Sequence, residues 1–342
     1  MRARTRARVV LLLGFGAAAL AAWPAAAGPD DLDCLALRLG EPQADLVPAG
    51  QRAAFAVMDL SRGRLVWHQQ DAWLAQLAVS PGSVFKLVTA YAALSGRLVD
   101  PHRTQRCLGK EREPDVGGVR CWLPEGHGPV SLSKALALSC NRYFAWLGQE
   151  LGGEPILAAA RELGLGRSTG SDLPGEVAGG LPSALFPETA ARLAVGQVEG
   201  LRVTPLQLLS LVGAVGNGGL LLSPRLAVPA GGASLPPRGV LGAPEALRFL
   251  RGAMEEASAF GTGSRARLGR LGLAGKTGTT AWQSVSWRTH AWYVGFWPAH
   301  RPAFALVVFV HEGQGADEAA GLAGRVVERV EQARAACGGG AP

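Results

Sequence analysis

The chain has 342 residues and a mass of 35.5 kDa, which is enough for one large domain or two small ones. Apolar residues make up 48% and charged residues 18%, a composition that excludes a disordered protein and predicts a large buried core. Of the net charge of +7, four charges are arginines within the first eight residues, so the rest of the chain carries +3. That small excess predicts no nucleic-acid partner.

The first 27 residues have the order of a secretory signal. The four arginines precede an apolar run over 9–23, and Pro-Ala-Ala-Ala-Gly follows at 24–28, which predicts cleavage after Ala27. The alternative is an uncleaved anchor, although residues 9–27 are barely long enough to span a bilayer and Pro24 interrupts them. In both cases residues 28–342 are expected to be exported, to the periplasm or the outer face of the cytoplasmic membrane. An uncleaved N-terminus would add association with the inner membrane.

The elements alternate between strand and helix patterns along the chain. Residues 53–59 and 64–68 predict a β-hairpin, and a helix is predicted from Ser83 to its stop at Gly96. Further helices are predicted at 131–151, 154–163, 187–195 and 205–216. The C-terminal part is predicted to contain strands at 271–280, 290–297 and 303–311, and then an amphipathic helix at 316–336.

Strands therefore open and close the chain, whereas helices fill its middle. This order predicts a single α/β (α+β) domain over 28–342, with a sheet lobe built from both ends of the chain and an inserted helical lobe. We place the sheet lobe at about 45–80 and 245–336, and the helical lobe at about 83–240. A catalytic cleft between two such lobes is a common arrangement.

Five cysteines remain after the signal, in a compartment that permits disulfides. Cys107 and Cys121 flank a polar, glycine-rich stretch, and we predict a disulfide between them across a hairpin-like loop. The alternative is a metal site that includes His102 or His127. The spacings His-x4-Cys, Cys-x13-Cys and Cys-x5-His fit no tight zinc template, so we expect no metal and no cofactor.

The other cysteines are less informative. Cys34 and Cys337 lie near the two ends of the exported chain and form the second candidate pair, although the sequence does not show that they meet. Cys140 is left over, and we expect it to be a small buried side chain.

Three short motifs occur in one order along the chain. The first is Ser-Val-Phe-Lys at 83–86, the second is Ser-Cys-Asn at 139–141, and the third is Lys-Thr-Gly-Thr at 276–279. Each motif alone is a weak signal. All three together, each in a fitting local structure, are a strong signal for a catalytic serine.

The spacing of the first motif suits nucleophilic catalysis. A serine hydroxyl needs a base within hydrogen-bond reach, and residues three apart on a helix share a face, so Lys86 can reach Ser83. Backbone N–H groups at the helix N-terminus favour a developing negative charge there. The base must be a neutral amine, and we expect Lys276, as a second cation, to lower its pKa.

Lysine usage supports this assignment. The chain has four lysines and 30 arginines, yet both motif positions are lysine. Arginine cannot be deprotonated in a protein, so it cannot serve as the base at position 86. The argument is weaker for Lys276, whose role can be purely electrostatic.

The third motif suits a strand that binds substrate. Gly278 lets a substrate backbone approach the strand closely, and Thr277 and Thr279 offer hydroxyls to a carboxylate. The backbone N–H groups of Thr279 and Ser83 are expected to form an oxyanion hole. A rival Gly-x-Ser-x-Gly match at 166–170 is set aside, because a nucleophile elbow needs a strand before it and a helix after it.

At this point the segments PGSVFK, SCN and KTGT resemble those of the penicillin-binding, active-site-serine D,D-transpeptidases. Longer segments extend the resemblance to roughly residues 50–335, including LGLGRSTGSDLPGE and VGQVEGLRVTPLQLLSLVGAVGNGG. The resemblance implies a five-stranded antiparallel sheet flanked by helices, plus an all-helical lobe.

The resemblance also implies a role for each motif residue. Ser83 would be acylated and Lys86 would be its base. Ser139 would relay a proton to the leaving amine, and Asn141 would bind the backbone amide of the substrate. The terminal carboxylate would be held by Lys276, Thr277 and Thr279. The substrate would be a D-Ala-D-Ala stem peptide of peptidoglycan, and β-lactams would acylate the same serine as mimics of it.

Several functions stay open. A D,D-transpeptidase and a D,D-carboxypeptidase share one acyl-enzyme and differ in whether an amine or water takes the acyl group. The opening VMDLSRGRLVW and SPGSVFK also resemble class D-like β-lactamases, although Asn141 stands where that group usually has an aliphatic residue. A non-catalytic penicillin-recognising sensor is the third alternative, and the intact Ser83, Lys86 and Lys276 argue against it.

Two departures from the family pattern are visible. Ser83 lies only 56 residues after the predicted cleavage site, so we expect neither a glycosyltransferase nor a pedestal module before it. This departure argues against the usual place in an elongation or division complex, and the sequence does not identify the protein partners. The segment VGQVEGLRVTP looks about two residues longer than the usual form, which lengthens a turn.

Overall fold

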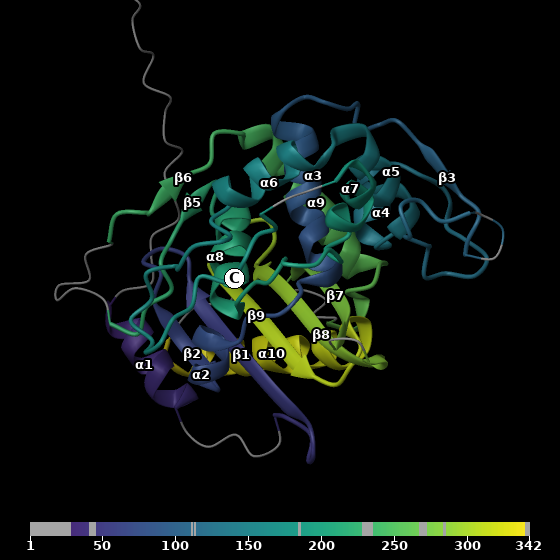
Figure 1. Cartoon of the computed structure of the whole chain (residues 1–342). Helices are drawn as coiled ribbons and strands as arrows, with labels where there is room; N and C mark the ends of the chain where they lie inside the picture. The colour runs from purple at the N-terminus through teal and green to yellow at the C-terminus, as the bar shows by residue number, and fades with distance from the viewer. Residues whose placement is uncertain are drawn as a thin grey trace, which may run out of the picture.

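The computed structural model describes residues 29–40, 46–110, 112, 114–183, 186–227, 235–266, 272–282 and 285–338 (Figure 1). The predicted signal at 1–27 lies outside these residues. Among the helices within these residues, none combines the length and the apolar character needed to cross a membrane.

The centre of the molecule is one antiparallel sheet of five strands in the order β2-β1-β9-β8-β7. The strands are β1 (Arg52–Asp59), β2 (Leu65–Gln69), β7 (Ala274–Trp282), β8 (Val285–Trp297) and β9 (Phe304–His311). Two strands come from the first part of the chain and three from its last part, and β1 pairs with β9 to join them. The predicted fold class, a five-stranded antiparallel sheet flanked by helices, is confirmed.

β1 and β9 are buried on both faces of the sheet, and both are nearly continuous apolar runs. Along β1, Ala54, Ala56 and Met58 belong to one core, and Phe55 and Val57 to the other. This alternation follows the two-residue period of a strand. The first core packs against α8 (Pro205–Gly216) and the second against α10 (Ala320–Ala336), which lie on opposite faces of the sheet (Figure 1).

The remaining elements mostly form the helical part above the sheet (Figure 1). Before α8 these are α2 (Asp71–Gln76), η1 (Gly82–Phe85), α3 (Lys86–Ser95), β3 (Gln105–Cys107), β4 (Gly128–Val130), α4 (Leu132–Ala137), α5 (Asn141–Leu151), α6 (Gly153–Glu162), η2 (Pro187–Thr189) and α7 (Ala190–Ala194). After it come β5 (Leu220–Leu221), β6 (Gly239–Val240), α9 (Pro244–Ala259), η3 (Ser264–Ala266) and the π-helical turn η5 (Gly315–Ala319).

The prediction of one helix over 131–151 is wrong. The helix ends after Ala137, and a second one begins at Asn141. Ser139 has a φ of +55°, which a continuing right-handed helix does not allow. The second motif therefore lies at a helix N-terminus and not inside a helix.

Helix α9 was not predicted from the sequence. It packs against α3 and α4 on one side and β7 on the other, so it connects the two expected lobes. Pro244 at its first turn and the following Glu245 are ordinary start signals, but they follow a loop rich in proline and glycine. The division into the two lobes remains a proposal.

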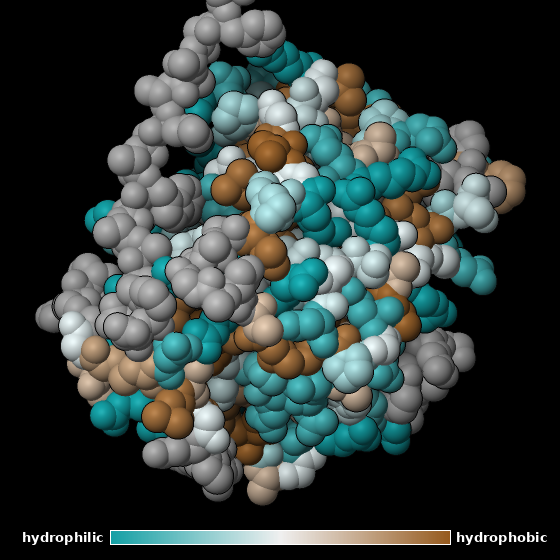
Figure 2. Space-filling model, turned by 90° about the vertical axis from the view of Figure 1, so that its left-hand side faces the viewer, coloured by the Kyte–Doolittle hydropathy of each residue, from teal (hydrophilic) through white to brown (hydrophobic). Residues whose placement is uncertain are grey.

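The pairing of Cys34 with Cys337 that the sequence left open is formed in the structure. The disulfide joins α1 (Pro29–Leu39) to the end of α10, with the two Cα atoms 6.0 Å apart. On the side of the molecule that carries α1, β5 and β6, hydrophobic and hydrophilic residues are mixed (Figure 2). Leu37 and Val240 are among its exposed apolar side chains.

Candidate active site

Ser83 lies in the short turn η1, immediately before α3. The turn rests directly on β7, because a Cβ at Gly82 would lie only 2.6 Å from the carbonyl oxygen of Thr279. Gly82 also has a φ of +50°, so glycine suits this position in two ways. The contact brings the first and third motifs together.

Lys86 occupies the first turn of α3 and is fully buried. Its Nζ lies 3.0 Å from Ser83 Oγ, as the i, i+3 spacing predicts. The same nitrogen lies 2.8 Å from the carbonyl oxygen of Ser139 and 2.6 Å from Asn141 Oδ1. The amine therefore connects the nucleophile to the second motif.

Lys276 reaches the second motif from the sheet. Its Nζ lies 3.0 Å from Ser139 Oγ and 2.8 Å from the carbonyl oxygen of Thr277. Since Lys86 Nζ lies 3.2 Å from the same Ser139 Oγ, this hydroxyl lies between two lysine amines. A hydroxyl with such neighbours can receive a proton from one group and pass it to another.

Burial lowers the pKa of Lys86 to about 7, so a neutral amine is available near neutral pH. Desolvation is the main cause of this shift, whereas the sequence pointed to the charge of Lys276. Burial also lowers the pKa of Lys276 well below its usual value, and the nearby Lys86 lowers it further. When two buried amines share one hydroxyl, repulsion between the two positive charges disfavours protonation of both at once.

Asn141 is the first residue of α5, and both ends of its amide have a partner. Its Oδ1 accepts from Lys86, and its Nδ2 donates to the carbonyl oxygen of Arg120 at 3.0 Å. The loop that contains Arg120 therefore helps to orient the side chain that the resemblance assigns to substrate binding.

The hydroxyls of the third motif are also held in place. Thr277 Oγ1 lies 2.6 Å from Thr262 Oγ1, and Thr279 Oγ1 accepts from the backbone N–H of Gly315 at 3.0 Å. Because Thr279 Oγ1 accepts there, its own hydrogen is free to be donated to a carboxylate. A Cβ at Gly278 would lie 2.9 Å from the carbonyl oxygen of Pro81, so glycine at this position lets the segment before Ser83 lie close to β7. The oxyanion hole at Ser83 and Thr279 stays a prediction.

Ser80 and Gly196 hold the nucleophile turn, and sequence reasoning missed both. Ser80 Oγ donates to the carbonyl oxygen of Gly196 at 2.8 Å, and Trp292 Nε1 donates to the carbonyl oxygen of Ser80 at 3.1 Å. A Cβ at Gly196 would lie 2.2 Å from the carbonyl oxygen of Gly82. These partners are far apart in the sequence, so no local pattern indicates them.

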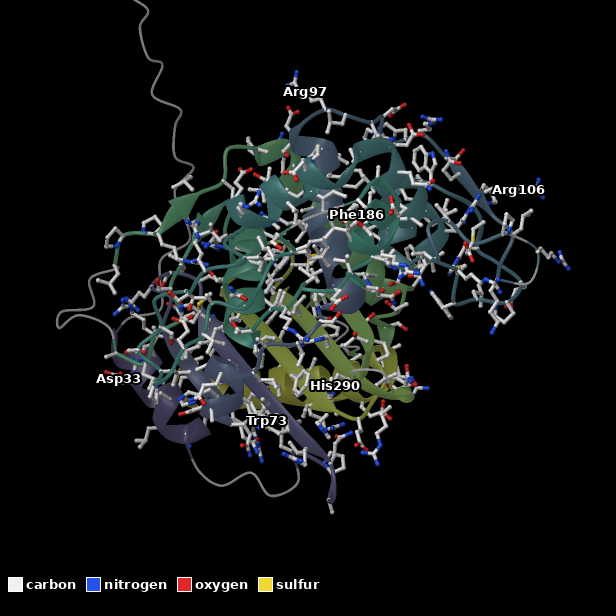
Figure 3. All side chains as sticks on the ribbon, in the orientation of Figure 1. Asp33, Trp73, Arg97, Arg106, Phe186 and His290 are labelled. Carbon is white, nitrogen blue, oxygen red and sulfur yellow. A yellow bond between two sulfur atoms is a disulfide. The ribbon has the colours of Figure 1, made fainter. Side chains whose placement is uncertain are left out.

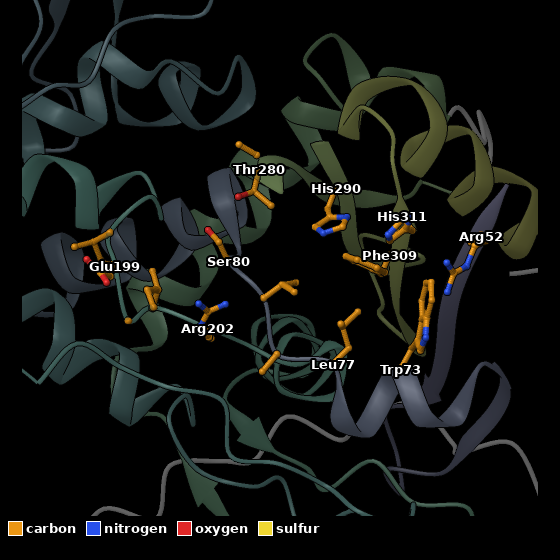
Figure 4. Close-up of a pocket in the computed structure, with 16 residues that line it drawn as sticks. Arg52, Trp73, Leu77, Ser80, Glu199, Arg202, Thr280, His290, Phe309 and His311 are labelled. Carbon is orange, nitrogen blue, oxygen red and sulfur yellow. The ribbon is translucent and has the colours of Figure 1, made fainter. Parts of the chain in front are cut away.

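A cavity of about 640 Å³ borders the nucleophile turn (Figure 4). Glu199 and Arg202 lie at one end and Trp73 and His311 at the other, with Ser80 between them. None of the motif residues with an assigned role lines it.

The predicted Cys107–Cys121 disulfide is wrong in this structure, where both residues and Cys140 are free thiols. His127 Nδ1 lies 3.2 Å from Cys121 Sγ and 3.6 Å from Cys107 Sγ. Cys140 approaches from the break between α4 and α5. His102 is not part of the group. The expectation of no metal rested on spacing alone, whereas this geometry brings four ligand-type side chains together.

A serine with a buried lysine one turn later, a second serine and a strand lysine form a site for acyl transfer through a covalent serine intermediate. The family model of the penicillin-binding protein transpeptidase domain matches residues 53–330. The chain belongs to this family.

Curated relatives agree with this family. Stage V sporulation protein D of Bacillus subtilis is 32% identical over 252 residues, which are 69% of this chain and 38% of that protein. The peptidoglycan D,D-transpeptidase MrdA of Acinetobacter baumannii is 30% identical over 280 residues, 71% of this chain and 41% of that protein. The chain thus spans about two fifths of the length of these relatives.

Solved structures share the fold. A complex of PBP2 and MreC from Helicobacter pylori matches with a TM-score of 0.71 and 27% identity, over 82% of this chain and 60% of that one. The transpeptidase domain of Burkholderia pseudomallei penicillin-binding protein 3 matches with a TM-score of 0.74, over 90% of this chain and 95% of that one. At 20% identity, the second match supports the fold alone.

Proposed function

We propose that this chain is a peptidoglycan D,D-transpeptidase that works through an acyl-enzyme on Ser83. The observation that carries the proposal is the Lys86 amine, which is buried, has a pKa of about 7 and lies 3.0 Å from Ser83 Oγ. The Ser139 hydroxyl lies between this amine and Lys276, which supports a shared path for the proton.

In the proposed reaction, Lys86 takes the proton of the Ser83 hydroxyl while Oγ attacks the carbonyl carbon of the penultimate D-alanine. The peptide bond to the last D-alanine then breaks, and the leaving amine receives its proton through Ser139. The resulting ester on Ser83 is resolved by the amine of a second stem peptide. If water resolves it instead, the activity is that of a D,D-carboxypeptidase.

Substrate contacts follow from the positions of the other motif residues. The terminal carboxylate binds beside Lys276, with donated hydrogens from Thr277 and Thr279, and Asn141 binds a backbone amide. β-Lactams react at the same serine because their amide carbonyl takes the place of the scissile one. The reaction takes place outside the cytoplasm, on the side of the membrane that faces the cell wall.

The first test is labelling of the purified full-length chain with a fluorescent penicillin, followed over hours. Wild type and Ser168→Ala, which alters the rejected Gly-x-Ser-x-Gly match, should both form stable label, whereas Ser83→Ala should form none. Label that disappears quickly while the penicillin is consumed would instead identify a β-lactamase. An unlabelled wild-type chain would refute the acyl-enzyme.

The second test uses a stem pentapeptide that ends in D-Ala-D-Ala, with and without a D-amino acid as acceptor. Mass spectrometry should detect exchange of the terminal D-alanine for the acceptor, and Ser83→Ala should abolish it. If only the shortened tetrapeptide forms with acceptor present, the chain is a carboxypeptidase. A chain that binds penicillin but never turns over peptide is a sensor.

A further inference from the structure

Four side chains with metal-ligand chemistry converge beside the catalytic motifs. They are Cys107 at the end of β3, Cys121 and His127 in the loop before β4, and Cys140 between α4 and α5. One ligand atom from each lies within 4.8 Å of all the others. The three cysteines are buried, and His127 directs Nδ1 toward the sulfurs of Cys107 and Cys121.

We propose that Cys107, Cys121, His127 and Cys140 bind one zinc ion. Bond lengths of about 2.3 Å to sulfur and about 2.0 Å to nitrogen place tetrahedral ligand atoms roughly 3.5 to 3.8 Å apart. The observed group needs only a small contraction to reach that size. Three cysteines and one histidine with no open position are typical of a structural zinc site.

Two very short strands frame the loop between β3 and β4. Each of these strands has three residues, and the hairpin, on which Arg106 lies, extends from the edge of the helical part (Figure 3). Trp122, next to a ligand, is 50% exposed. A loop with so small a core folds stably when a metal ion joins its ends.

The backbone of the loop is shaped to bring the ligands together. Gly109 has a φ of +97°, and a Cβ there would lie 1.9 Å from the carbonyl oxygen of Pro124. A Cβ at Gly126 would lie 2.3 Å from the carbonyl oxygen of Cys107. These two glycines let the chain double back so tightly that Cys107 meets the residues near 121–127.

A disulfide explains this arrangement less well. A Cys107–Cys121 disulfide would give no function to the thiol of Cys140. It would also give none to the imidazole of His127, which is directed at the sulfurs of Cys107 and Cys121. A zinc ion bound by three thiolates carries one net negative charge. Cys121 and Cys140 lie close enough to Lys86 for this negative charge to interact with the Lys86 ammonium. Zinc displaces the thiol protons when it binds, so no oxidant is needed.

The site also touches the catalytic machinery, and this part of the inference rests on the proposed function. Cys140 lies between Ser139 and Asn141 in the chain, and Asn141 Nδ2 donates to the carbonyl oxygen of Arg120, the residue before Cys121. Zinc would therefore fix the second motif from both sides. Its ligands act as positioning residues and do not touch the substrate.

The test begins with the metal content of the purified full-length chain. We expect one zinc per chain, and after exchange with Co²⁺ we expect strong thiolate-to-metal absorption in the near ultraviolet. His127→Ala and Cys121→Ser should lose the metal, whereas His102→Ala, at the nearby histidine, should keep it. The metal and Co²⁺ measurements on wild type need no variant, so a variant that fails to fold does not decide the result.

Two results would overturn the site. One is a folded wild-type chain that contains no metal and takes up neither zinc nor Co²⁺, and a Cys107–Cys121 disulfide found by peptide mapping would then identify the alternative. The other is zinc that persists unchanged in His127→Ala. The positioning role predicts that chelation slows penicillin acylation of Ser83 at least about tenfold and that added zinc restores it. An unchanged rate would refute that role alone, and a zinc-loaded chain that is never acylated would refute the proposed function but not the site.

Discussion

Lys86 shows how the environment of one side chain sets its chemistry. The ammonium is buried among three acceptors, the carbonyl oxygen of Ser139, Asn141 Oδ1 and Ser83 Oγ, and these hydrogen-bond partners include no carboxylate. Burial therefore disfavours the charged form more than the hydrogen bonds favour it, and the pKa falls to about 7. A base that is half neutral near physiological pH is well matched to general base catalysis.

The pH dependence of acylation follows from this value. Below pH 7 the Lys86 amine is protonated and cannot take the Ser83 proton, so the rate of penicillin acylation should rise with pH and level off above 7. Lys86→Arg, which is always protonated, should remove this inflection and lower the rate about 10²- to 10⁴-fold. The exposed Lys134→Arg is the matched control and should keep the wild-type profile. A Lys86→Arg variant with that same profile would show that another group is the base.

Sequence reasoning found the residues whose spacing is local. Ser83 and Lys86 are one helical turn apart, and Thr277 and Thr279 alternate along a strand, so their relation is visible in a few letters. The supports for these residues were missed. Ser80, Gly196 and Gly315 make hydrogen bonds with segments far away in the chain, and short motifs carry no information on such contacts.

At the scale of elements, the break between α4 and α5 shapes the site. It turns what would be an interior helical position into the start of a helix, so that Asn141 and Ser139 both face Lys86. The break requires Ser139 to adopt a φ of +55°, where a side chain with a Cβ is unfavourable. Ser139 thus supplies a hydroxyl to the site although its backbone adopts an unfavourable conformation.

Replacing Ser139 can separate the hydroxyl from the backbone. Ser139→Gly and Ser139→Ala both lose the hydroxyl, so both should slow penicillin acylation. Only glycine tolerates the positive φ, so Ser139→Gly should be more stable than Ser139→Ala by about 1 kcal/mol in urea unfolding. Equal stabilities would show that the positive φ is not needed in solution, and wild-type acylation in either variant would exclude the proton relay.

The errors at this scale have physical causes. Residues 131–151 have helical spacing on both sides of the break, so periodicity alone predicts one helix, and the turn at Ser139 depends on tertiary contacts with two lysines. β1 and β9 were predicted well because apolar runs buried on both faces are strong signals, whereas β8 begins at Val285, five residues before its predicted start. The cysteine loop was misjudged because spacing along the chain did not reveal that Cys140 would approach from another element.

At the scale of the whole molecule, the Cys34–Cys337 disulfide connects the two ends of the described chain on the α10 face of the sheet. The nucleophile turn packs into the other core, with Val84 and Phe85. The bond therefore supports the fold at a distance from the chemistry. Its closed loop is long, so it restricts the unfolded chain strongly.

Loss of this disulfide should affect stability and not catalysis. Cys34→Ser and Cys337→Ser should each lower the free energy of unfolding by about 2 to 5 kcal/mol, because the unfolded chain gains freedom. The double variant should be no less stable than either single one, since all three lack the same bond. Penicillin acylation at 25 °C should keep its wild-type rate. A stability equal to wild type would show that the bond does not form in the purified chain.

The sheet has a further consequence for the order in which the protein becomes functional. β1 and β2 are made early, but β1 needs β9 as its second neighbour, and Lys276 arrives on β7 long after Ser83. During synthesis, Ser83 is therefore made well before β7, so under the proposed function the acyl-transfer site is incomplete until the last part of the chain is made. Because the last three strands complete the sheet, we expect the acyl-transfer chemistry of the proposed function to begin only after the C-terminal part has folded.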